Sequence, residues 1–316
     1  MDSEVIIIGG GPAGSTCAWQ LRQAGIETII LDRQQFPRMK LCAGWITPRV
    51  IRDLEIDLAT YPHSLLTFDR LHFRIHRRKL AIRTRQYSIR RYEFDHWLLE
   101  RANVPVYQHT AQHIRVEQGG YVIDDAYRCK YLVGAGGTNC PVYRAFFQQI
   151  NPRPRALLIT TMEQEFACAY QDQNCYLWFA EHNLPGYSWY VPKGNGYLNL
   201  GIGGKFAELK ARGETIRDHW ERFVQSLSRL GLIGDDSLQP RGYNYYLGQK
   251  IQTGRMGNAF LVGDAAGLAT TDMGEGIGPA VESGLLAARA IIAGTDYSLK
   301  AITSRSLWNI LLPWRW

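Results

Sequence analysis

The stretch Val5-Ile-Ile-Ile-Gly-Gly-Gly-Pro-Ala-Gly14 lies at the start of the chain and decides its fold. Four apolar β-forming residues lead into a turn with the glycine spacing G-x-G-x-x-G, at Gly9, Gly11 and Gly14. A helical pattern follows, and then a second apolar strand that ends in Asp32. In this context the glycines let the backbone approach a pyrophosphate, the helix N-terminus offers free N–H groups, and the acid accepts from ribose hydroxyls. The sequence therefore predicts a dinucleotide site.

A second glycine-rich motif near the other end of the chain indicates which dinucleotide is bound. Residues 258–267 form another apolar run that ends in Gly263-Asp264, and Gly274-Glu-Gly-Ile-Gly-Pro279 then leads into a helix. NAD needs no second motif, whereas the ribityl and flavin half of FAD needs another acid and another helix N-terminus. We expect Asp264 to hold the ribityl hydroxyls and the backbone around Gly276 and Ile277 to face the pyrophosphate or the flavin. The two motifs together predict FAD.

Composition limits the remaining possibilities. The chain has 316 residues, 46% of them apolar, which is enough for one sizeable core or two linked ones. It contains no run of 18 apolar residues, and Asp2 and Glu4 replace the basic start of a signal peptide. Six cysteines without a C-x-x-C pair indicate reduced thiols in a cytoplasmic protein, and we expect no metal site. The net charge of +7 suits an anionic cofactor, and equally an anionic substrate or membrane surface.

The hydrophobic pattern changes along the chain and predicts two domains. Residues 71–89 alternate as strands do, and residues 157–202 have an antiparallel β pattern rich in aromatic residues, with Asn195-Gly196 as a hairpin turn. We predict an α/β protein, α+β overall, in which a Rossmann-like FAD-binding domain is interleaved with an antiparallel β-sheet substrate domain. The predicted boundaries are 1–70, 90–155 and 250–316 for the FAD-binding domain, and 71–89 and 156–249 for the substrate domain.

A loop follows Asp32 and Arg33 and carries several candidate side chains. Pro37 and Gly44 mark it as a loop, and the basic residues within it, Arg38 among them, could reach phosphates. Cys42 could approach the flavin ring, although a single cysteine at this spacing is more typical of an inert packed thiol.

Several motifs, in their order along the chain, resemble the geranylgeranyl reductase family of FAD enzymes. They are G-G-G-P-A-G, F-P-R-x-K-x-C-A-G, R-x-x-F-D, G-A-G-G-T-x-C-P-V, P-G-Y-x-W-Y-V-P and G-D-A-A-G followed by G-E-G-I. The family is part of the para-hydroxybenzoate hydroxylase fold group, which also contains flavin-dependent halogenases and monooxygenases. The resemblance extends to about Gly294, and only 22 residues follow, so that the C-terminal helical region of longer members is mostly missing.

The resemblance implies both a fold and a set of cofactor contacts. It implies a Rossmann-like FAD domain with a β-sheet substrate domain, and reduction of isolated C=C bonds in prenyl chains. In this family the loop cysteine lies beside the flavin, which favours such a place for Cys42, and Arg91 of R-x-x-F-D would hold a phosphate or ribose. Combined with the motif residues, the predicted cofactor-binding set is Gly9, Gly11, Ala13, Gly14, Asp32, Arg33, Arg38, Cys42, Gly44, Arg91, Ala111, Asp264, Gly274, Gly276 and Ile277.

Tyr187 and Trp189 match the family's substrate-cavity strand, and with Cys42 they form the predicted catalytic set. The two aromatic residues are two apart, so that they face the same side of their strand, although the pattern alone is also typical of ordinary sheet core. Two departures stand out. The hydroxylases' Asp-Gly motif is Gly136-Gly137 here, which argues against their direct handling of NADPH. In place of the two tryptophans of the halogenases this chain has Tyr187 and Trp189. The catalytic lysine of the halogenases has no identified counterpart.

The function predicted is that of an FAD-dependent oxidoreductase, a reductase of C=C bonds in an isoprenoid or other apolar substrate. An external donor, NAD(P)H or a ferredoxin-type protein, would reduce FAD, and we expect no nucleic-acid partner. One alternative is a flavin-dependent monooxygenase or halogenase-like enzyme, which would use a flavin hydroperoxide. The other is a shortened flavin-binding or electron-relay protein without turnover of its own.

Two segments predict contact with a membrane surface. Residues 298–316 mix tryptophan and leucine with lysine and arginine, a composition typical of interfacial segments, and the strands between Arg74 and Arg85 are strongly basic. The same tail could instead dock on the FAD domain and bury its own rings, and Pro313 prevents a single continuous helix. The expected location is cytoplasmic, with peripheral contact at the inner membrane surface.

Overall fold

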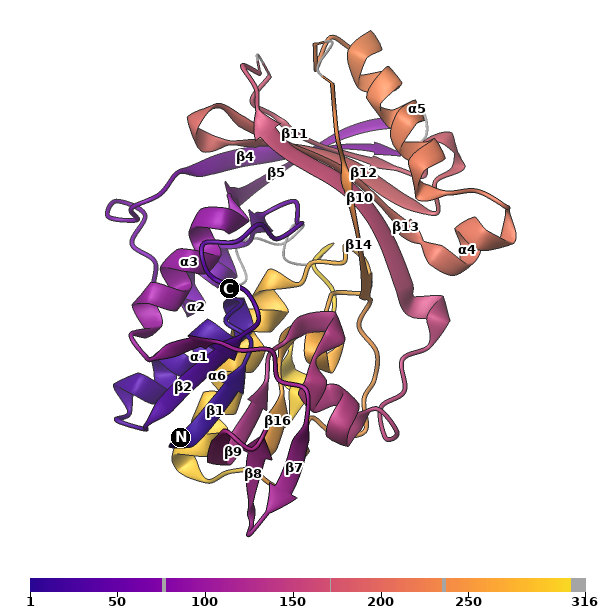
Figure 1. Ribbon diagram of the computed structural model, residues 1–316. Coiled ribbons are helices and arrows are strands. Elements are labelled where there is room, and N and C mark those ends of the chain that lie inside the picture. The colour runs from indigo at the N-terminus through magenta and orange to yellow at the C-terminus, as the bar shows by residue number, and fades with distance from the viewer. Residues whose placement is uncertain (76–77, 171, 235–236, 308–316) are drawn as a thin grey trace.

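The computed structural model describes residues 1–75, 78–170, 172–234 and 237–307. The chain forms two eight-stranded sheets that lie one above the other in Figure 1. The lower sheet carries the N-terminal glycine motif, and the upper sheet is capped on its outer side by a long helix. The predicted class, a Rossmann-like domain interleaved with an antiparallel β-sheet domain, is confirmed.

The lower sheet is built around a parallel core. Strand β1 pairs in parallel with β2 and β9, β2 pairs with β6, and β9 pairs with β16, so that these strands end at one edge of the sheet. A hairpin, β7–β8, and the short β15 complete it. Its strands are β1 (Asp2–Ile8), β2 (Thr28–Asp32), β6 (Val106–Gln108), β7 (Ile114–Glu117), β8 (Gly120–Ile123), β9 (Tyr127–Gly134), β15 (Arg255–Met256) and β16 (Ala259–Leu261).

Helices pack on one face of this sheet, and the two helices that follow the glycine motifs touch each other. The helices of this domain are α1 (Pro12–Gln23), α2 (Pro48–Asp53), α3 (Arg91–Ala102) and α6 (Ile277–Ala293). A Cβ atom at Gly284 of α6 would lie 2.5 Å from the carbonyl oxygen of Ala13 in α1, so the two helix backbones touch. Val5 and Ile7 of β1 pack beneath them, while Ile6 and Ile8 face a second core on the opposite side. The first face therefore holds the N-termini of α1 and α6 next to each other.

The upper sheet has the strand order β14-β10-β13-β12-β11-β4-β5-β3 and is antiparallel except for the pair β11–β4. Both residues of the Asn195-Gly196 turn between β12 and β13 have positive φ, 59° and 69°, which confirms the predicted hairpin. The strands are β3 (Trp45–Ile46), β4 (Leu65–Ile75), β5 (Arg78–Ile89), β10 (Leu158–Ala167), β11 (Cys175–Phe179), β12 (Gly186–Lys193), β13 (Tyr197–Lys205) and β14 (Arg241–Tyr246).

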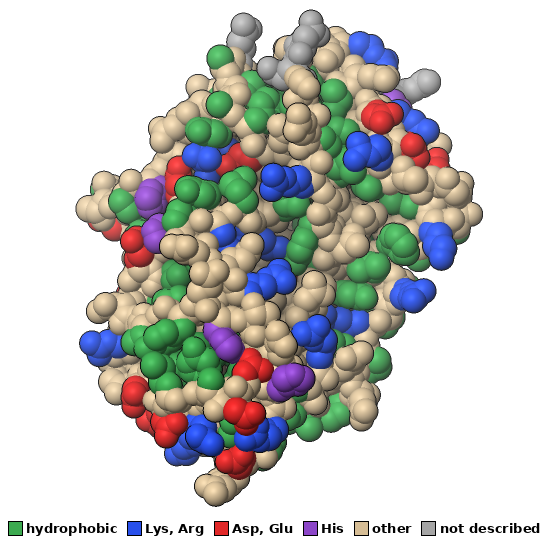
Figure 2. Space-filling model, viewed as in Figure 1, with side chains coloured by type: hydrophobic (Ala, Val, Ile, Leu, Met, Phe, Trp, Pro, Cys, Tyr) green, Lys and Arg blue, Asp and Glu red, His purple; other side chains and the backbone are tan. Residues whose placement is uncertain are grey.

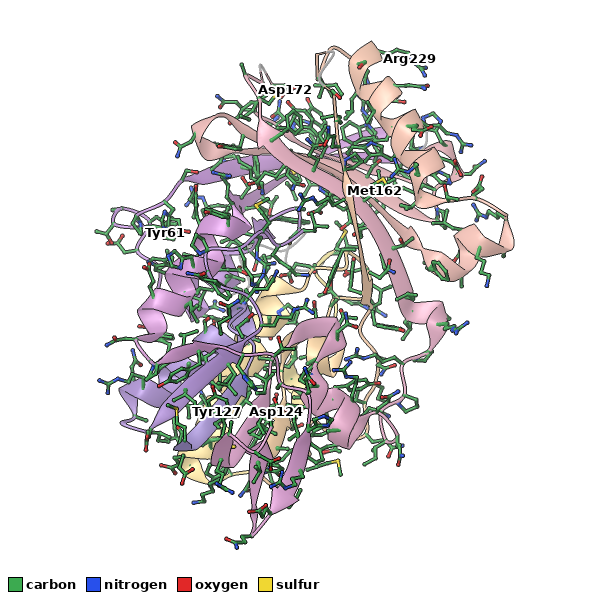
Figure 3. The ribbon with its side chains drawn as sticks, viewed as in Figure 1. Tyr61, Asp124, Tyr127, Met162, Asp172 and Arg229 are labelled. Carbon is green, nitrogen blue, oxygen red and sulfur yellow. The ribbon has the colours of Figure 1, made fainter. Side chains whose placement is uncertain are left out.

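The outer face of the upper sheet is covered by helices α4 (Phe206–Ala211) and α5 (Ile216–Arg229). Thr215 and Asp218 form a reciprocal capping box at the start of α5. Figure 3 shows Met162 on the sheet and Arg229 at the far end of α5. Met162 belongs to the apolar cluster between sheet and helix, whereas its neighbours Thr161 and Glu163 face the other domain, because side chains alternate along a strand. This alternation gives the sheet one covered face and one face toward the lower domain.

The sheets divide the chain at slightly different places from the predicted boundaries. The upper sheet includes residues 65–70 and the short strand β3, both of which the sequence analysis gave to the FAD-binding domain. The remaining elements are single turns at residues 137–139, 143–147, 155–157, 181–183, 194–196, 263–266 and 299–301. Within the described part of the chain, no helix has both the length and the hydrophobicity needed to cross a membrane.

Candidate functional site

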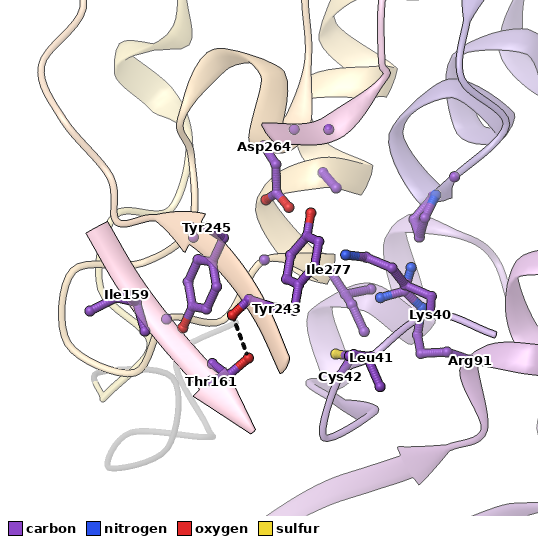
Figure 4. Close-up of a pocket in the computed structure, with 18 of the residues that line it drawn as sticks. Lys40, Leu41, Cys42, Arg91, Ile159, Thr161, Tyr243, Tyr245, Asp264 and Ile277 are labelled. Carbon is purple, nitrogen blue, oxygen red and sulfur yellow. Dashed lines mark hydrogen bonds between the residues drawn. The ribbon is translucent and has the colours of Figure 1, made fainter. Parts of the chain in front are cut away.

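A cavity of about 910 Å³ lies between the two sheets, near the upper end of the usual range of about 300–1,000 Å³ for ligand sites. Figure 4 shows Asp264 and Ile277 of the lower domain facing it, with Lys40, Cys42 and Arg91 on another side and Thr161 on strand β10. Figure 2 shows lysine and arginine side chains across the middle of the visible face, between the two domains. The cavity therefore joins the nucleotide side of the molecule to the inner face of the upper sheet.

The glycine turn after β1 forms one end of the cavity. The Asp32 carboxylate accepts hydrogen bonds from the backbone N–H groups of Gly10 and Gln34, both at 2.8 Å, and so fixes the turn. Gly9 has φ +110°, and a Cβ there would lie 2.5 Å from the Ala135 oxygen, so only glycine fits. At Gly11 a Cβ would meet nothing nearer than an Arg38 nitrogen at 3.5 Å, which leaves room for a ligand beside the N-terminus of α1.

The second motif forms the middle of the cavity. The carboxylate of Asp264 lines the cavity and has no hydrogen bond to the described residues. The side chain of Arg153 holds this turn from behind, with Nη2 donating to the carbonyl oxygens of Asp264 at 3.2 Å and Ala265 at 2.7 Å. Glu275 accepts from the N–H of Gly278 at 2.5 Å, at the start of α6. An anchored backbone thus presents a free carboxylate beside a helix N-terminus.

Two arginines at the cavity wall share one buried acid. Asp95 accepts a bidentate pair of hydrogen bonds from Arg91 at 2.6 and 2.7 Å, and Arg38 Nη2 lies 3.6 Å from the same carboxylate. Burial alone would lower the pKa of Arg91, but Asp95 raises it, so that Arg91 stays charged. Arg38 Nε is buried without a partner among the described residues. These guanidinium groups are positioned to bind an anion.

The loop that carries Cys42 is fixed by a buried lysine. Lys193 Nζ donates to the carbonyl oxygens of Ala43 and, at 2.9 Å, of Ile89. Burial lowers the pKa of Lys193 to about 8. Gly44 has φ +62° and packs against the Ile89 oxygen and Lys193 Nζ, so packing on β5 explains this glycine without a ligand. Cys42 lines the cavity, and its Sγ accepts from the Gly44 N–H at 3.4 Å.

Tyr187 and Trp189 lie on the inner face of β12, as the two-residue spacing predicts, and both line the cavity. The Trp189 ring covers Gly201 on the neighbouring strand, where any side chain would collide with it. Trp189 Nε1 donates to Asn199 at 2.7 Å, and Asn199 donates in turn to the carbonyl oxygen of Cys42 at 3.3 Å. Tyr187 donates to the Met273 oxygen at 2.5 Å. The two rings therefore form an apolar wall whose polar atoms are already paired.

The structure brings most of the predicted residues to one place. Gly14 and Gly44 do not line the cavity; Gly14 packs on the Gly9 oxygen instead. Ala111 lies in the loop after β6, near the contact between His109 and Asp124 at 2.7 Å (Figure 3). The predicted residues that line the cavity are Gly9, Gly11, Ala13, Asp32, Arg33, Arg38, Cys42, Arg91, Ala111, Tyr187, Trp189, Asp264, Gly274, Gly276 and Ile277.

Sequence reasoning assigned no role to several ionisable residues in the cavity wall, and three of these have raised pKa values. Burial raises the pKa of Glu163 to about 8 and that of Glu275 to about 7. Burial also raises the pKa of Tyr245 well above its usual value. Glu163 lies within a polar alternation, Thr161-Glu163-Glu165, which is the signal that would have placed it on the cavity face of a strand.

The residues present fit FAD. Gly11 leaves an open cradle at the N-terminus of α1, Asp264 offers an unpaired carboxylate, and Arg38 has an unpaired buried N–H. Two helix N-termini and two arginines suit a pyrophosphate, while two acids suit the ribose and ribityl hydroxyls. When bound, FAD would supply two-electron hydride chemistry, and this chain would supply the binding and orientation.

Removal of the Asp264 carboxylate should weaken FAD binding. We expect Asp264→Ala to lose FAD during dialysis at least tenfold faster than Asp69→Ala, because the Asp69 carboxylate is exposed and makes no contact in the described structure. The measurement is the ratio of flavin to protein absorbance over time. Equal loss from both variants would contradict the role of Asp264.

Cys42 is the predicted flavin neighbour, so its removal should change the flavin spectrum. We expect Cys42→Ala to alter the absorbance envelope or the reoxidation rate of the flavin. Cys129→Ala, which removes a thiol buried in the second core of the lower domain, should change neither. If both variants match the wild-type protein, Cys42 is only a packing residue.

Comparison with known proteins identifies related sequences. A family model described as FAD dependent oxidoreductase matches residues 4–93, which include the glycine turn, Asp32 and Cys42. The chain is 26% identical to the menaquinone reductase of Mycolicibacterium smegmatis, over 98% of this chain and 80% of that protein. It is also 26% identical to the geranylgeranyl diphosphate reductase of Rhodobacter capsulatus, over 93% and 76%.

Solved structures share the fold. A geranylgeranyl bacteriochlorophyll reductase-like protein from Thermoplasma acidophilum superposes with a TM-score of 0.80 at 20% identity, over 93% of this chain and 78% of that one. A flavin-dependent brominase superposes with a TM-score of 0.74 at 19% identity, over 95% and 81%. The chain is an FAD-dependent oxidoreductase, and the resemblance to the geranylgeranyl reductase family predicted from its motifs is confirmed.

Proposed function

We propose that the protein reduces C=C bonds in the prenyl chain of an isoprenoid substrate. The observation that carries this proposal is a row of aromatic rings that begins at Tyr187 in the cavity wall and continues through the apolar cluster on the inner face of the upper sheet. Tyr187 stacks on Phe179 with ring centroids 5.1 Å apart, and Phe179 stacks on Phe73 at 6.0 Å. Each ring stands on a different strand, so the row crosses β12, β11 and β4. A flat apolar wall of this kind suits a long hydrocarbon chain better than a compact polar substrate.

The names of relatives agree with a prenyl substrate. One is a menaquinone reductase and another a geranylgeranyl diphosphate reductase, and both of those substrates carry prenyl chains. In the present chain Trp189 and Tyr187 would orient the alkene, and their apolar wall would keep water away from it. The electron donor in this proposal is external, either NAD(P)H or a ferredoxin-type protein.

The proposal predicts that a prenyl compound reoxidises the reduced flavin without oxygen. We expect anaerobically reduced protein to regain its oxidised flavin spectrum after addition of geranylgeranyl diphosphate, with a product two mass units heavier for each bond reduced. Geranylgeranyl diphosphate with all its double bonds already saturated is the matched control and should leave the flavin reduced.

Rapid mixing of the reduced protein with oxygen separates the remaining possibilities. Simple slow reoxidation is expected of a reductase. A long-lived flavin hydroperoxide spectrum, without reduction of the prenyl compound, would instead favour the monooxygenase or halogenase. Reoxidation by neither reagent on a useful timescale would favour a flavin-binding protein without turnover.

We also propose that the hairpin β4–β5 touches an anionic membrane surface. On its outer side Arg70 faces Arg83 across the strand pair and Arg74 faces Lys79, and none of the four makes a salt bridge with the described residues. Adjacent like charges repel, so they favour an anionic partner. On the inner side Leu80 is opposite Phe73, the last ring of the aromatic row, and is 55% exposed.

In this proposal the hairpin β4–β5 links the cavity wall to the membrane, in which prenyl lipids are dissolved. The apolar row ends at exposed Leu80 and Ile75, while the basic residues stand on the other side of the same hairpin. The tail was the other predicted membrane segment. Its residues 308–316, including Trp308 and Trp314, lie outside the described residues, while Leu307 packs on the inner apolar cluster of the upper sheet.

Charge reversal on the hairpin should weaken vesicle binding. We expect Arg70→Glu with Arg83→Glu to lose at least about 2 kcal/mol of attraction to anionic vesicles at low salt, roughly thirty-fold or more in affinity, since each basic residue contributes about 1 kcal/mol and each new carboxylate adds repulsion. Arg217→Glu with Arg229→Glu, an equal change on the exposed side of α5, is the control and should bind nearly as the wild type does. Co-sedimentation measures both, and no binding by the wild-type chain at low salt would refute the contact.

A further inference from the structure

Glu163 is a buried carboxyl on the cavity side of β10 that no part of the FAD site uses. It is 3% exposed and lines the cavity. In register it lies between Arg241 of β14 and Gly201 of β13, and beyond Gly201 comes Trp189 of β12. Because Gly201 has no side chain, the Trp189 ring covers it and extends the apolar wall toward β10. Glu163 thus stands at the edge of the surface on which we propose that the prenyl chain lies.

The surroundings of Glu163 leave its proton available to the cavity. In the described structure its carboxyl makes no hydrogen bond to another side chain and one hydrogen bond to the backbone of Cys42. The charged groups facing it are Lys40 from the loop, Lys193 from β12, Glu165 on its own strand and Arg241, its register partner on β14. Burial outweighs the two lysines and raises the pKa of Glu163 to about 8, so the carboxyl is largely protonated at neutral pH.

Other ionisable groups in the wall have their protons or acceptor atoms engaged. The Tyr187 hydroxyl donates to the Met273 oxygen, and Glu275 accepts from the Gly278 N–H at the start of α6. Burial makes Tyr245 a weaker acid than a free tyrosine, since its pKa is raised well above the usual value. Glu165 is held by Arg90 at 2.8 Å. Burial favours the protonated form of both Glu163 and Glu275, and of the two only Glu163 stands on the upper sheet, beside the Gly201 position that the Trp189 ring covers.

We propose that Glu163 is the catalytic acid that protonates the substrate alkene. The inference rests on the proposed reductase function. Reduction of C=C adds a hydride, with its electron pair, to one carbon and a proton to the other. The hydride comes from the reduced flavin, which is thereby oxidised, and the proton comes from the Glu163 carboxyl, which becomes a carboxylate. Solvent then reprotonates Glu163 through the open side of the cavity, so atoms and electrons balance over one turnover.

The test compares Glu163→Gln with Glu163→Asp and with Glu165→Gln, the next carboxyl on the same face of the strand. Each holoprotein is reduced anaerobically and mixed with geranylgeranyl diphosphate across a range of pH. In the wild type we expect the rate of flavin reoxidation to fall as pH rises through about 8, because the acid form of Glu163 is lost there. Glu163→Gln should be slower by about 10²–10⁴-fold and lack this fall, since general acids contribute factors of that size.

A second readout measures the proton directly. Infrared difference spectra of the wild type should contain the carbonyl stretch of a protonated carboxyl that disappears as pH rises through about 8. Glu163→Gln should lack this band and Glu165→Gln should retain it, while the band of Glu275, whose pKa is raised to about 7, should remain in both variants. Glu163→Asp should recover part of the rate. In all variants the flavin should have the wild-type spectrum and should be reduced by a chemical reductant as in the wild type.

The outcomes separate this inference from the function on which it rests. Wild-type rate and pH dependence in Glu163→Gln would overturn the inference alone and leave the reductase intact. A wild-type protein that never reduces the prenyl compound would refute the proposed function, and the role of Glu163 with it. If the fall in rate near pH 8 is lost in Glu165→Gln but kept in Glu163→Gln, Glu165 is the proton donor and the inference about Glu163 is overturned.

Discussion

The backbone contact between α1 and α6 is the constraint on which the rest of the site depends. Gly284 lets α6 approach the carbonyl oxygen of Ala13, and a Cβ added at Gly263 would lie only 3.2 and 3.4 Å from the Cβ atoms of Ala13 and Ala280. Close packing of this kind tolerates no added volume. It brings the N-termini of two helices from opposite ends of the sequence to one cavity, where their free N–H groups and dipoles add. A dinucleotide longer than NAD requires such a double site.

Much of the fold and half of the site could be read from the sequence because the signals are local. The turn around Gly9, the acid Asp32 and the motif at Asp264 each combine a strand, a glycine turn and a helix within a short stretch. Strand periodicity placed Tyr187 and Trp189 on one face, and the family resemblance rather than the pattern directed that face toward the cavity.

The remainder depends on contacts between distant segments, which periodicity does not encode. Lys193 ends an ordinary strand, and its role in holding the Cys42 loop exists only because β12 and β5 meet that loop. Gly44, predicted as a cofactor contact, is a glycine because β5 leaves no space for a side chain. Glu163 needs the pairing of β10 with β13 and the absence of a side chain at Gly201 before its place beside Trp189 is apparent.

The interleaving of the two domains has a consequence for how the protein is made. The parallel strands β1 and β2 leave the ribosome long before β16 and α6, which complete the same sheet and the same cavity. The whole upper sheet is therefore synthesised between the two halves of the lower one. Domains usually fold as units while the chain emerges. Here β1 and β2 must wait for their distant partners, so flavin capture can follow only after the upper sheet, β16 and α6 have all been translated.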